Sequence, residues 1–417
     1  MKDRPALSDL TRRQTLAGLS IASMLPLTLS ACARADGPDI APDAPWDEVI
    51  AAARGQTVNW AAWAGDPKIN AYIAWTGAVL RKRFDIAVRH IKTGDTANTV
   101  QTLLADKASG RAAGGRTDLV WINGENFNAA RKAGLLWGPF AQRLPHWRLV
   151  DTEGKPATVS DFTIPIEGYE SPWGMAQLTF FYDSARGTMP PRSVPAMLDW
   201  AAAHPGRMAY PAPPDFVGIA FVKQALLELI TDRSVLYRPF ADAEFAAHTR
   251  PLWAFLDALH PHLWRKGRAY PHDYRALRQL LEDREVDIAM SFNPSEAATA
   301  VAGGFLPPSS RSYILDGGTI QNCHFVAIPF NAAAKAAAMV TANFLLSPEA
   351  QARKADTKVW GDPTVLDPAK LSAEDRARFA ALAAPQPIGG GEAKGLLEPH
   401  PSWQVKLAEA WRARYAS

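Results

Sequence analysis

The sequence predicts an α/β fold of two lobes joined by two crossing segments. Strand-like and helix-like segments alternate through the first third of the chain, which is typical of a parallel sheet covered by helices. Apolar extended stretches at 175–182 and 325–329 separate this region from a mainly helical middle and then return to it. A chain of 417 residues also exceeds what one ordinary core requires. We expect residues 54–172 and 318–417 to form the first lobe and residues 173–317 the second.

The first strand–helix unit, residues 57–84, organises the expected first lobe. Asp66 directly precedes Pro67, which places a helix-capping carboxylate beside a proline at the first helical position. A strand that leads straight into a helix leaves the backbone N–H groups of the first helical turn unpaired at the end of the sheet. We therefore expect a ligand site here that includes Trp63, Asp66 and Asn70. The alternative for a tryptophan at this place is that it only fills the core.

Polar residues follow another buried strand of the first lobe, residues 118–122. Asn123 and Glu125 stand between that strand and the next expected helix. Because the carboxyl ends of parallel strands meet at one edge of a sheet, we expect these side chains to lie near Trp63.

The crossing segments and the second lobe supply the remaining expected ligand-binding side chains. A loop ends in a cap-like Asp215 before a helix over 217–231, and a strand over 287–292 leads into a second cap-and-proline helix start. We expect these groups to converge in one cleft between the lobes. They are Tyr169, Trp173, Asp215, Asn293, Ser295, Thr319 and Gln321.

The first 32 residues predict an export signal. Arg12 and Arg13 precede an apolar run over 16–29 that is too short to span a membrane as a mature helix. The run ends in small residues before Cys32, as in a bacterial lipobox, and the arginine pair resembles a twin-arginine signal. We expect lipidation of Cys32, a tether over residues 33–53, and a periplasmic protein anchored to the membrane only through its lipid.

Composition excludes a polyanionic partner. The formal charge is +3, and the export signal carries four basic and two acidic residues, so the remainder is near neutral. We therefore expect no nucleic-acid binding, and we expect a monomer. The 14 tryptophans supply flat apolar faces that suit stacking of small ligands, although most must belong to the cores. If Cys32 is acylated, Cys323 stands alone and the mature chain contains no disulfide.

The order of lobe, crossing, lobe and return crossing resembles the type II periplasmic binding proteins, the clamshell solute receptors of ABC importers. Five motifs allow a narrower comparison: Trp63-Ala-Gly-Asp-Pro-Lys-Ile-Asn70, Trp121-Ile-Asn-Gly-Glu-Asn-Phe127, Ser291-Phe-Asn-Pro-Ser-Glu-Ala297, Gly318-Thr-Ile-Gln-Asn322 and Val359-Trp-Gly-Asp362. Through them, nearly all of residues 54–417 resemble the YnjB family of ABC-transporter receptors. The resemblance implies a solute receptor that delivers its ligand to permease and ATPase subunits.

The ligand class must come from the residues themselves. The sequence has no adjacent pair of tyrosines, which ferric receptors characteristically use, and no glycine-rich phosphate loop at a helix start. His260 and His262 could ligate a metal, but their spacing does not suit one helix face, so we expect no metal and no cofactor. The mixture of tryptophans and carboxylates favours a cationic or heteroaromatic solute, such as thiamine or a polyamine.

Two other functions remain open. Thiaminase-like enzymes resemble this fold and use a cysteine in the cleft, so Cys323 on the return crossing is a candidate nucleophile. A buried free cysteine is usually inert, which disfavours this alternative and predicts a binding protein without catalytic residues. A structural lipoprotein without any solute is disfavoured by the polar residues at several strand ends.

Overall fold

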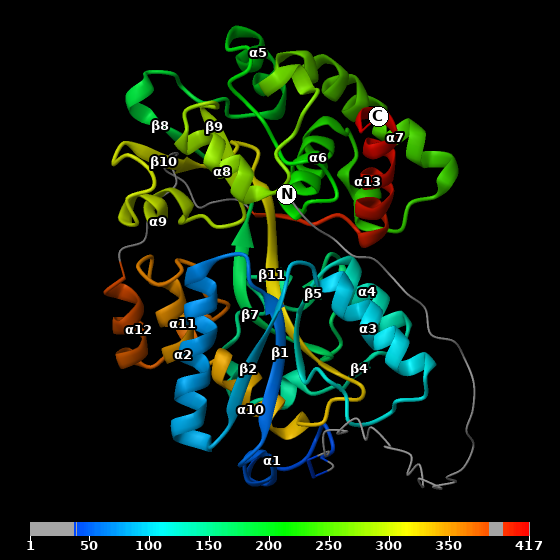
Figure 1. The fold of residues 1–417 in the computed structure, drawn as a ribbon, viewed down its shortest axis with the longest axis vertical. Helices are drawn as coiled ribbons and strands as arrows, with labels where there is room; N and C mark the ends of the chain where they lie inside the picture. Colours follow the sequence, from blue (N-terminus) through cyan, green and yellow to red (C-terminus); the bar gives the residue numbers. More distant parts are fainter. Residues whose placement is uncertain (1–36, 39, 383–394, 417) are drawn as a thin grey trace, which may run out of the picture. The chain divides into compact units, whose positions relative to one another are not determined.

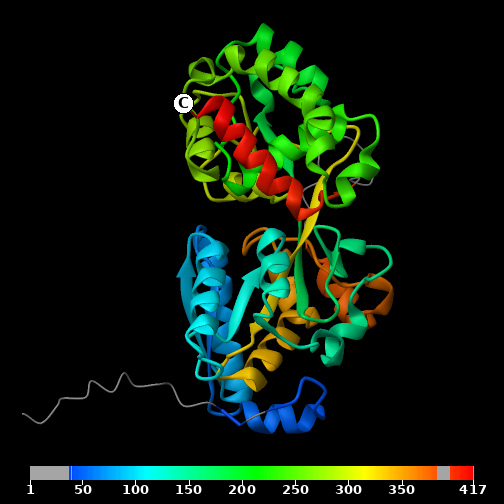
Figure 2. The same ribbon diagram turned by 90° about the vertical axis from the view of Figure 1, so that its right-hand side faces the viewer.

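The computed structural model, drawn as a ribbon in Figures 1 and 2, describes residues 37–38, 40–382 and 395–416. Its buried side chains form two hydrophobic cores. The first core draws on residues 40–175 and 323–371, and the second on residues 178–320 and 403–411. The predicted export signal and Cys32 lie outside the described residues. Among the described residues, no helix has both the length and the apolar character needed to cross a membrane.

The first core is built on a sheet whose main path runs in the order β12-β11-β3-β1-β2, with β4 and β7 also paired to β11. Strand β1 is parallel to β2 and β3, as the alternation of strands and helices predicts. Strand β11 is antiparallel to β3 and β7. The strands are β1 Thr57–Trp63, β2 Ala87–Thr93, β3 Leu119–Ile122, β4 Leu136–Trp137, β7 Glu170–Gln177, β11 Thr319–Pro329 and β12 Gly395–Leu397.

Capping side chains begin several helices around this sheet. Asp66 accepts the backbone N–H groups of Lys68 and Ile69, and Asp95 and Ser347 cap their helices in the same way. A two-stranded hairpin, β5 Ser160–Asp161 and β6 Ile164–Pro165, lies between β4 and β7 in the chain. The helices are α1 Trp46–Ala53, α2 Pro67–Phe84, α3 Thr96–Ala108, α4 Glu125–Lys132, α10 Lys335–Leu345, α11 Pro348–Ala355 and α12 Ala373–Ala380.

The predicted tether ends earlier than expected. Residues 46–53 form helix α1, which packs against α10, and its Val49 and Ala53 side chains are fully buried. Apolar residues at helical spacing bind this segment to the first core, so it is part of the fold.

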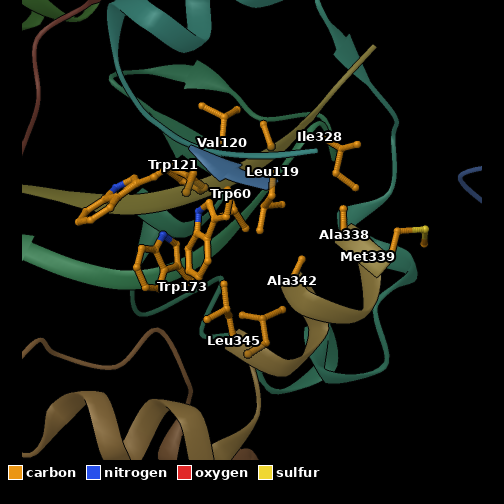
Figure 3. Close-up of a cluster of buried hydrophobic side chains, with 14 of the residues drawn as sticks. Trp60, Leu119, Val120, Trp121, Trp173, Ile328, Ala338, Met339, Ala342 and Leu345 are labelled. Carbon is orange, nitrogen blue, oxygen red and sulfur yellow. The ribbon is translucent and has the colours of Figure 1, made fainter. Parts of the chain in front are cut away.

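Large aromatic rings fill the part of the first core that adjoins the crossing strands. Trp173 of β7 lies edge-on to Trp60, Trp121 and Trp360, with ring centroids 5.0–5.4 Å apart. Figure 3 shows Trp60, Trp121 and Trp173 gathered beside one another, with Leu345 of α10 nearby. Such edge-to-face contacts add to the stability that burial of the rings provides.

The second core surrounds a three-stranded antiparallel sheet in the order β10-β8-β9. Its strands are β8 Thr179–Asp183, β9 Ile288–Ser291 and β10 Ser310–Tyr313. Its helices are α5 Val194–Ala203, α6 Phe216–Leu229, α7 Asp242–Leu259, α8 Tyr274–Glu282, α9 Glu296–Ala302 and α13 Pro401–Tyr415.

The last helix belongs to the second core, although we expected residues 318–417 to complete the first lobe. Trp403, Leu407 and Trp411 of α13 are buried among second-core residues, and both views show α13 beside α6 (Figures 1 and 2). The indole N–H of Trp411 also donates to the Tyr210 hydroxyl at 2.8 Å. The bulky aromatic side chains of α13 therefore determine where it packs.

Strands β7 and β11 carry the chain between the two cores. Met175 and Cys323 belong to the first core, whereas Leu178 and Ile320 belong to the second. The two crossings are hydrogen-bonded neighbours, because β7 and β11 are antiparallel and the Leu178 N–H donates to the Ile320 carbonyl at 2.8 Å.

Candidate functional site

Side chains of the second core contact one segment of the first, residues 357–361. The Asn293 amide donates to the Trp360 carbonyl at 3.1 Å, and the Ser295 hydroxyl donates to the Gly361 carbonyl at 2.8 Å. From the first core, the Lys68 ammonium donates to the carbonyl of Thr357 at 3.3 Å. The start of α2 and the start of α9 therefore meet the same segment at the boundary between the cores.

Trp63 ends β1 at this boundary and is half-buried. Its ring lies against Gly65, where an added Cβ would come within 1.8 Å of the ring, so the turn needs glycine there. The Arg275 guanidinium of α8 lies 6.0 Å from the ring centroid. Nearby, the Asn70 amide donates to the Ala64 carbonyl at 3.2 Å, and one oxygen of Asp66 accepts both capping N–H groups. These bonds fix the turn between β1 and α2.

Asp215 has the same capping role in the second core that Asp66 has in the first, because it caps α6. Its Oδ1 accepts the N–H groups of Val217 and Gly218 at 3.0 Å each. Burial raises the pKa of Asp215 to about 6, against the opposing effect of these hydrogen bonds. The adjacent rings of Phe216 and Phe292 pack 4.8 Å apart.

Other expected site residues have structural surroundings. Trp173 and Thr319 are fully buried, so neither presents a surface to a solute in this structure. Trp173 was expected to offer a stacking face, but its ring is enclosed by the aromatic cluster of the first core. Tyr169 packs under the Arg131 guanidinium, 3.5 Å from the ring centroid. Asn123 and Gln321 are half-buried.

A chain of hydrogen bonds at the same boundary connects Glu125 to residues that the sequence did not single out. The Lys223 ammonium of α6 donates to Gln404 Oε1 of α13 at 2.5 Å, and Gln404 Nε2 donates to Glu125 Oε2 at 2.5 Å. Lys223 also forms an ion pair of 2.6 Å with Glu398, which accepts a hydrogen bond of 3.0 Å from the Asn322 amide. The first core, the second core and crossing strand β11 are thereby linked.

This chain of hydrogen bonds borders a small pocket, which we call the carboxylate pocket. Its lining includes Ser160, Asp161, Phe162, Gln321, Asn322 and Glu398. Asp161 Oδ2 accepts the N–H of Gly124 at 2.5 Å. Gly124 has a positive φ of 63°, and a Cβ there would come within 2.8 Å of the Phe162 ring, so this corner also requires glycine.

Three carboxyl groups in and around the carboxylate pocket, those of Asp161, Glu125 and Glu170, have raised pKa values. Burial raises the pKa of Asp161 well above its usual range, and the nearby carboxyl groups of Glu125 and Glu398 raise it further. Burial likewise raises the pKa of Glu125, against the opposing charge of Lys223. Glu170 is fully buried, and its pKa is raised well above its usual range by burial and then by Asp161. The region holds more carboxyl groups than Lys223 can balance.

Comparison with known proteins identifies the family. Residues 75–381 match the family described as bacterial extracellular solute-binding protein. The chain is also 44% identical over 372 residues to Protein YnjB of Escherichia coli strain K12, covering 89% of this chain and 94% of that protein. The chain belongs to the bacterial extracellular solute-binding proteins. The family acts outside the cytoplasm, and the predicted YnjB resemblance is confirmed.

Solved structures confirm the predicted fold class. The periplasmic binding protein AfuA from Actinobacillus pleuropneumoniae, with fructose-6-phosphate bound, is similar with a TM-score of 0.59 at 15% identity, covering 87% of this chain and 99% of AfuA. A putative spermidine/putrescine ABC transporter from Listeria monocytogenes has a TM-score of 0.56 at 15% identity, with coverage of 86% and 98%. At such identities the similarity shows the type II periplasmic-binding fold alone.

The sequence analysis did not identify several residues at this boundary, and the sequence holds only weak signals for them. Lys223 ends an apolar run of seven residues at the start of α6, and it is the kind of buried charge that requires a partner. Glu398 and Gln404 lie more than 170 residues further along the chain, so the pairing of β12 with β11 and the packing of α13 on α6 are needed to bring them to Lys223. Asp161 occupies a short hairpin without a recognisable motif.

Cys323 is buried in this solute-binding protein. Burial raises the pKa of its thiol well above the usual range, against the opposing charge of Lys354. The thiolate that a nucleophile needs is therefore disfavoured. The thiol also lines the carboxylate pocket described above, but the chain's family consists of solute-binding proteins.

His260, one of the two histidines considered as metal ligands, is engaged in an aromatic network. His260 contacts the hydroxyl groups of Tyr210 at 2.7 Å and Tyr270 at 3.2 Å through its two ring nitrogens. Within the described part of the chain, no group of three or more histidine, cysteine, aspartate or glutamate side chains could hold a metal ion.

Proposed function

We propose that this solute-binding protein captures a small cationic or heteroaromatic solute between its two cores and delivers it to the permease and ATPase subunits of its importer. The convergence of polar side chains from both cores carries this proposal. Asn293 and Ser295 contact residues 360–361, and Gln404 contacts Glu125. Similar boundaries in proteins of this fold are natural places for ligands, because a closed pair of lobes contacts the solute from two sides.

The charge at the boundary supports the cationic class. Glu125 and Asp66 of the predicted site, together with Asp161 and Glu398, place several carboxyl groups there. A cation would offset their mutual repulsion, and Trp63 offers a partly exposed ring for stacking. The similar Listeria monocytogenes protein is named for spermidine and putrescine, which are solutes of this class. We further propose that the protein works as a monomer and is anchored through a lipid on Cys32.

Trp63 provides the test of this function. Tryptophan fluorescence would be followed while thiamine, putrescine and spermidine are titrated into the wild-type protein and into Trp63→Ala. Loss of a stacking ring is expected to weaken binding by about ten- to a hundredfold. Trp253 of α7 contacts Arg414 and Tyr415 within the second core, so Trp253→Phe is a matched control.

Native mass spectrometry of the protein from its own cell envelope would complement the titration by showing which solute travels with it. An affinity that is the same in the wild type and in Trp63→Ala would move the binding site away from the end of β1. A co-purified anion would contradict the cationic class while leaving the receptor function intact.

A further inference from the structure

The carboxylate pocket contains hydrogen-bond acceptors that lack partners. Asp161 and Asn322 are almost fully buried, and both line the pocket. Neither Asp161 Oδ1 nor Asn322 Oδ1 has a hydrogen-bond partner among the described residues. Their other polar atoms are engaged, because Asp161 Oδ2 accepts the Gly124 N–H and Asn322 Nδ2 donates to Glu398. Buried acceptors without donors are unfavourable, so two neighbouring ones indicate a missing donor.

The missing donor should carry positive charge. Glu125, Asp161 and Glu398 lie close enough together to influence one another electrostatically, and Lys223 is the cation that faces them. Glu170 adds a further buried carboxyl group beside Asp161, with Arg131 as its nearest cation. A neutral donor would satisfy the hydrogen bonds but would leave the excess of carboxyl groups unbalanced.

The space in the pocket limits what can enter. The carboxylate pocket has room for about one water-sized group. A primary ammonium group is of that size and offers three N–H donors, whereas a trimethylated ammonium is larger and offers none. Lys223 shows that neighbouring side chains already hold an ammonium, since its Nζ pairs with Glu398 and lies 4.4 Å from the centroid of the Phe162 ring.

We propose that the carboxylate pocket binds a primary ammonium group of the transported solute through Asp161 Oδ1 and Asn322 Oδ1. This proposal rests on the receptor function proposed above and narrows its ligand class to primary amines. The proposal assigns recognition of the solute's positive charge to Asp161 of the β5–β6 hairpin and Asn322 of crossing strand β11. Asp66 and Asp215, which the sequence suggested for this role, cap helices. The rest of the solute would extend from the pocket towards Gln321 at its edge.

A matched pair of ligands tests the donor requirement without any mutation. Putrescine and its N,N,N′,N′-tetramethyl derivative carry the same charge, but methylation adds bulk and removes N–H donors. Calorimetric titration of the wild-type protein should show binding of putrescine that is at least about tenfold tighter than that of the methylated diamine. Potassium chloride at the same ionic strength serves as the control for a site that accepts any small cation.

A variant locates the binding to this pocket. In Asp161→Asn the amide oxygen can still accept the Gly124 N–H, but the negative charge is lost. Putrescine affinity should fall by about ten- to a hundredfold, the range expected for a charge-assisted hydrogen bond. Asp183→Asn is the matched control, because Asp183 accepts hydrogen bonds from Ser309 and Ala185 in the second core. It should bind putrescine as the wild type does.

The outcomes separate this proposal from the receptor function. Equal binding of putrescine by the wild type and Asp161→Asn, or equal binding of both diamines, would overturn the amine pocket while leaving a working receptor. Potassium that competes as well as putrescine would make this a site for inorganic cations and would also overturn it. If putrescine, ethylammonium and spermidine all fail to bind below about 10 mM, the amine pocket is wrong. A different solute recovered from the cell envelope would then still support a receptor.

Discussion

Two fully buried lysines, one in each core, have opposite surroundings. Lys354 of α11 pairs with Asp362 at 2.8 Å, and His324 contacts the second oxygen of the same carboxylate at 3.3 Å. Lys223 of α6 pairs with Glu398, but Glu125 and Asp161 lie nearby as well. Charges are matched around Lys354, whereas carboxyl groups are in excess around Lys223.

The pKa values follow this difference. Burial alone would raise the pKa of Asp362, but Lys354 and His324 outweigh it, and the pKa is lowered. In the carboxylate pocket, burial dominates and the pKa of Asp161 is raised. Lys354 also donates to the Trp173 carbonyl and lies 4.9 Å from the Trp173 ring, so it fastens α11 to crossing strand β7. A balanced buried charge of this kind supports the fold, whereas a buried excess of like charges is typical of functional sites.

Removal of the balanced lysine should have the largest effect. Lys354→Met leaves Asp362 buried without its main partner, and the free energy of unfolding should fall by about 3–5 kcal/mol. Urea denaturation monitored by circular dichroism would measure this change. The double variant Lys354→Met with Asp362→Leu should recover much of the loss, since it removes both charges. If Lys354→Met is as stable as the wild type, the charges there do not support the fold.

Neutralising one aspartate in each region should change stability in opposite directions. Asp362→Asn should lower the free energy of unfolding by about 1–3 kcal/mol, because a hydrogen bond to a charged partner is weakened. Asp161→Asn should raise it by roughly 1 kcal/mol at pH 8, because it removes a buried carboxylate that has an excess of like charges around it.

The pH dependence sharpens this second comparison. A carboxyl group with a raised pKa favours the folded state below its unfolded pKa, and that contribution is lost as the pH rises through the folded pKa. The free energy of unfolding of the wild-type protein should therefore fall as the pH rises and Asp161 ionises. The fall should be smaller for Asp161→Asn, which has no carboxyl group at this position. Urea denaturation of both proteins between about pH 5 and pH 8 would show this. If Asp161→Asn and Asp362→Asn change the free energy of unfolding in the same direction, the two regions do not differ as we infer.

Local signals in the sequence predicted much of the fold. Asp66 before Pro67 and Asp215 both cap helices where the sequence places them, because capping depends on neighbouring residues. The parallel pairing of β1 with β2 and β3 follows from the same local alternation. The position of α13 did not follow, since amphipathic character does not say which core a helix will join.

The candidate site was less predictable than the fold. Glu125 drew attention in the sequence because it follows a buried strand, but its partner Gln404 is 279 residues away. Trp173 suited a ligand-stacking role by sequence, yet three other tryptophans from distant segments enclose it. Asp161 and Glu398 carry no motif, so the excess of carboxyl groups arises only when the chain folds.

Proton release on ligand binding tests the central claim most directly. Putrescine would be titrated calorimetrically into wild-type protein at about pH 7.5 in phosphate and in Tris buffer, which differ in ionisation enthalpy. We predict net proton release, because an ammonium in the carboxylate pocket favours ionisation of the carboxyl groups whose pKa values are raised. The observed binding enthalpy should therefore differ between the buffers. Saturable binding with the same enthalpy in both buffers, or with proton uptake, would contradict the claim.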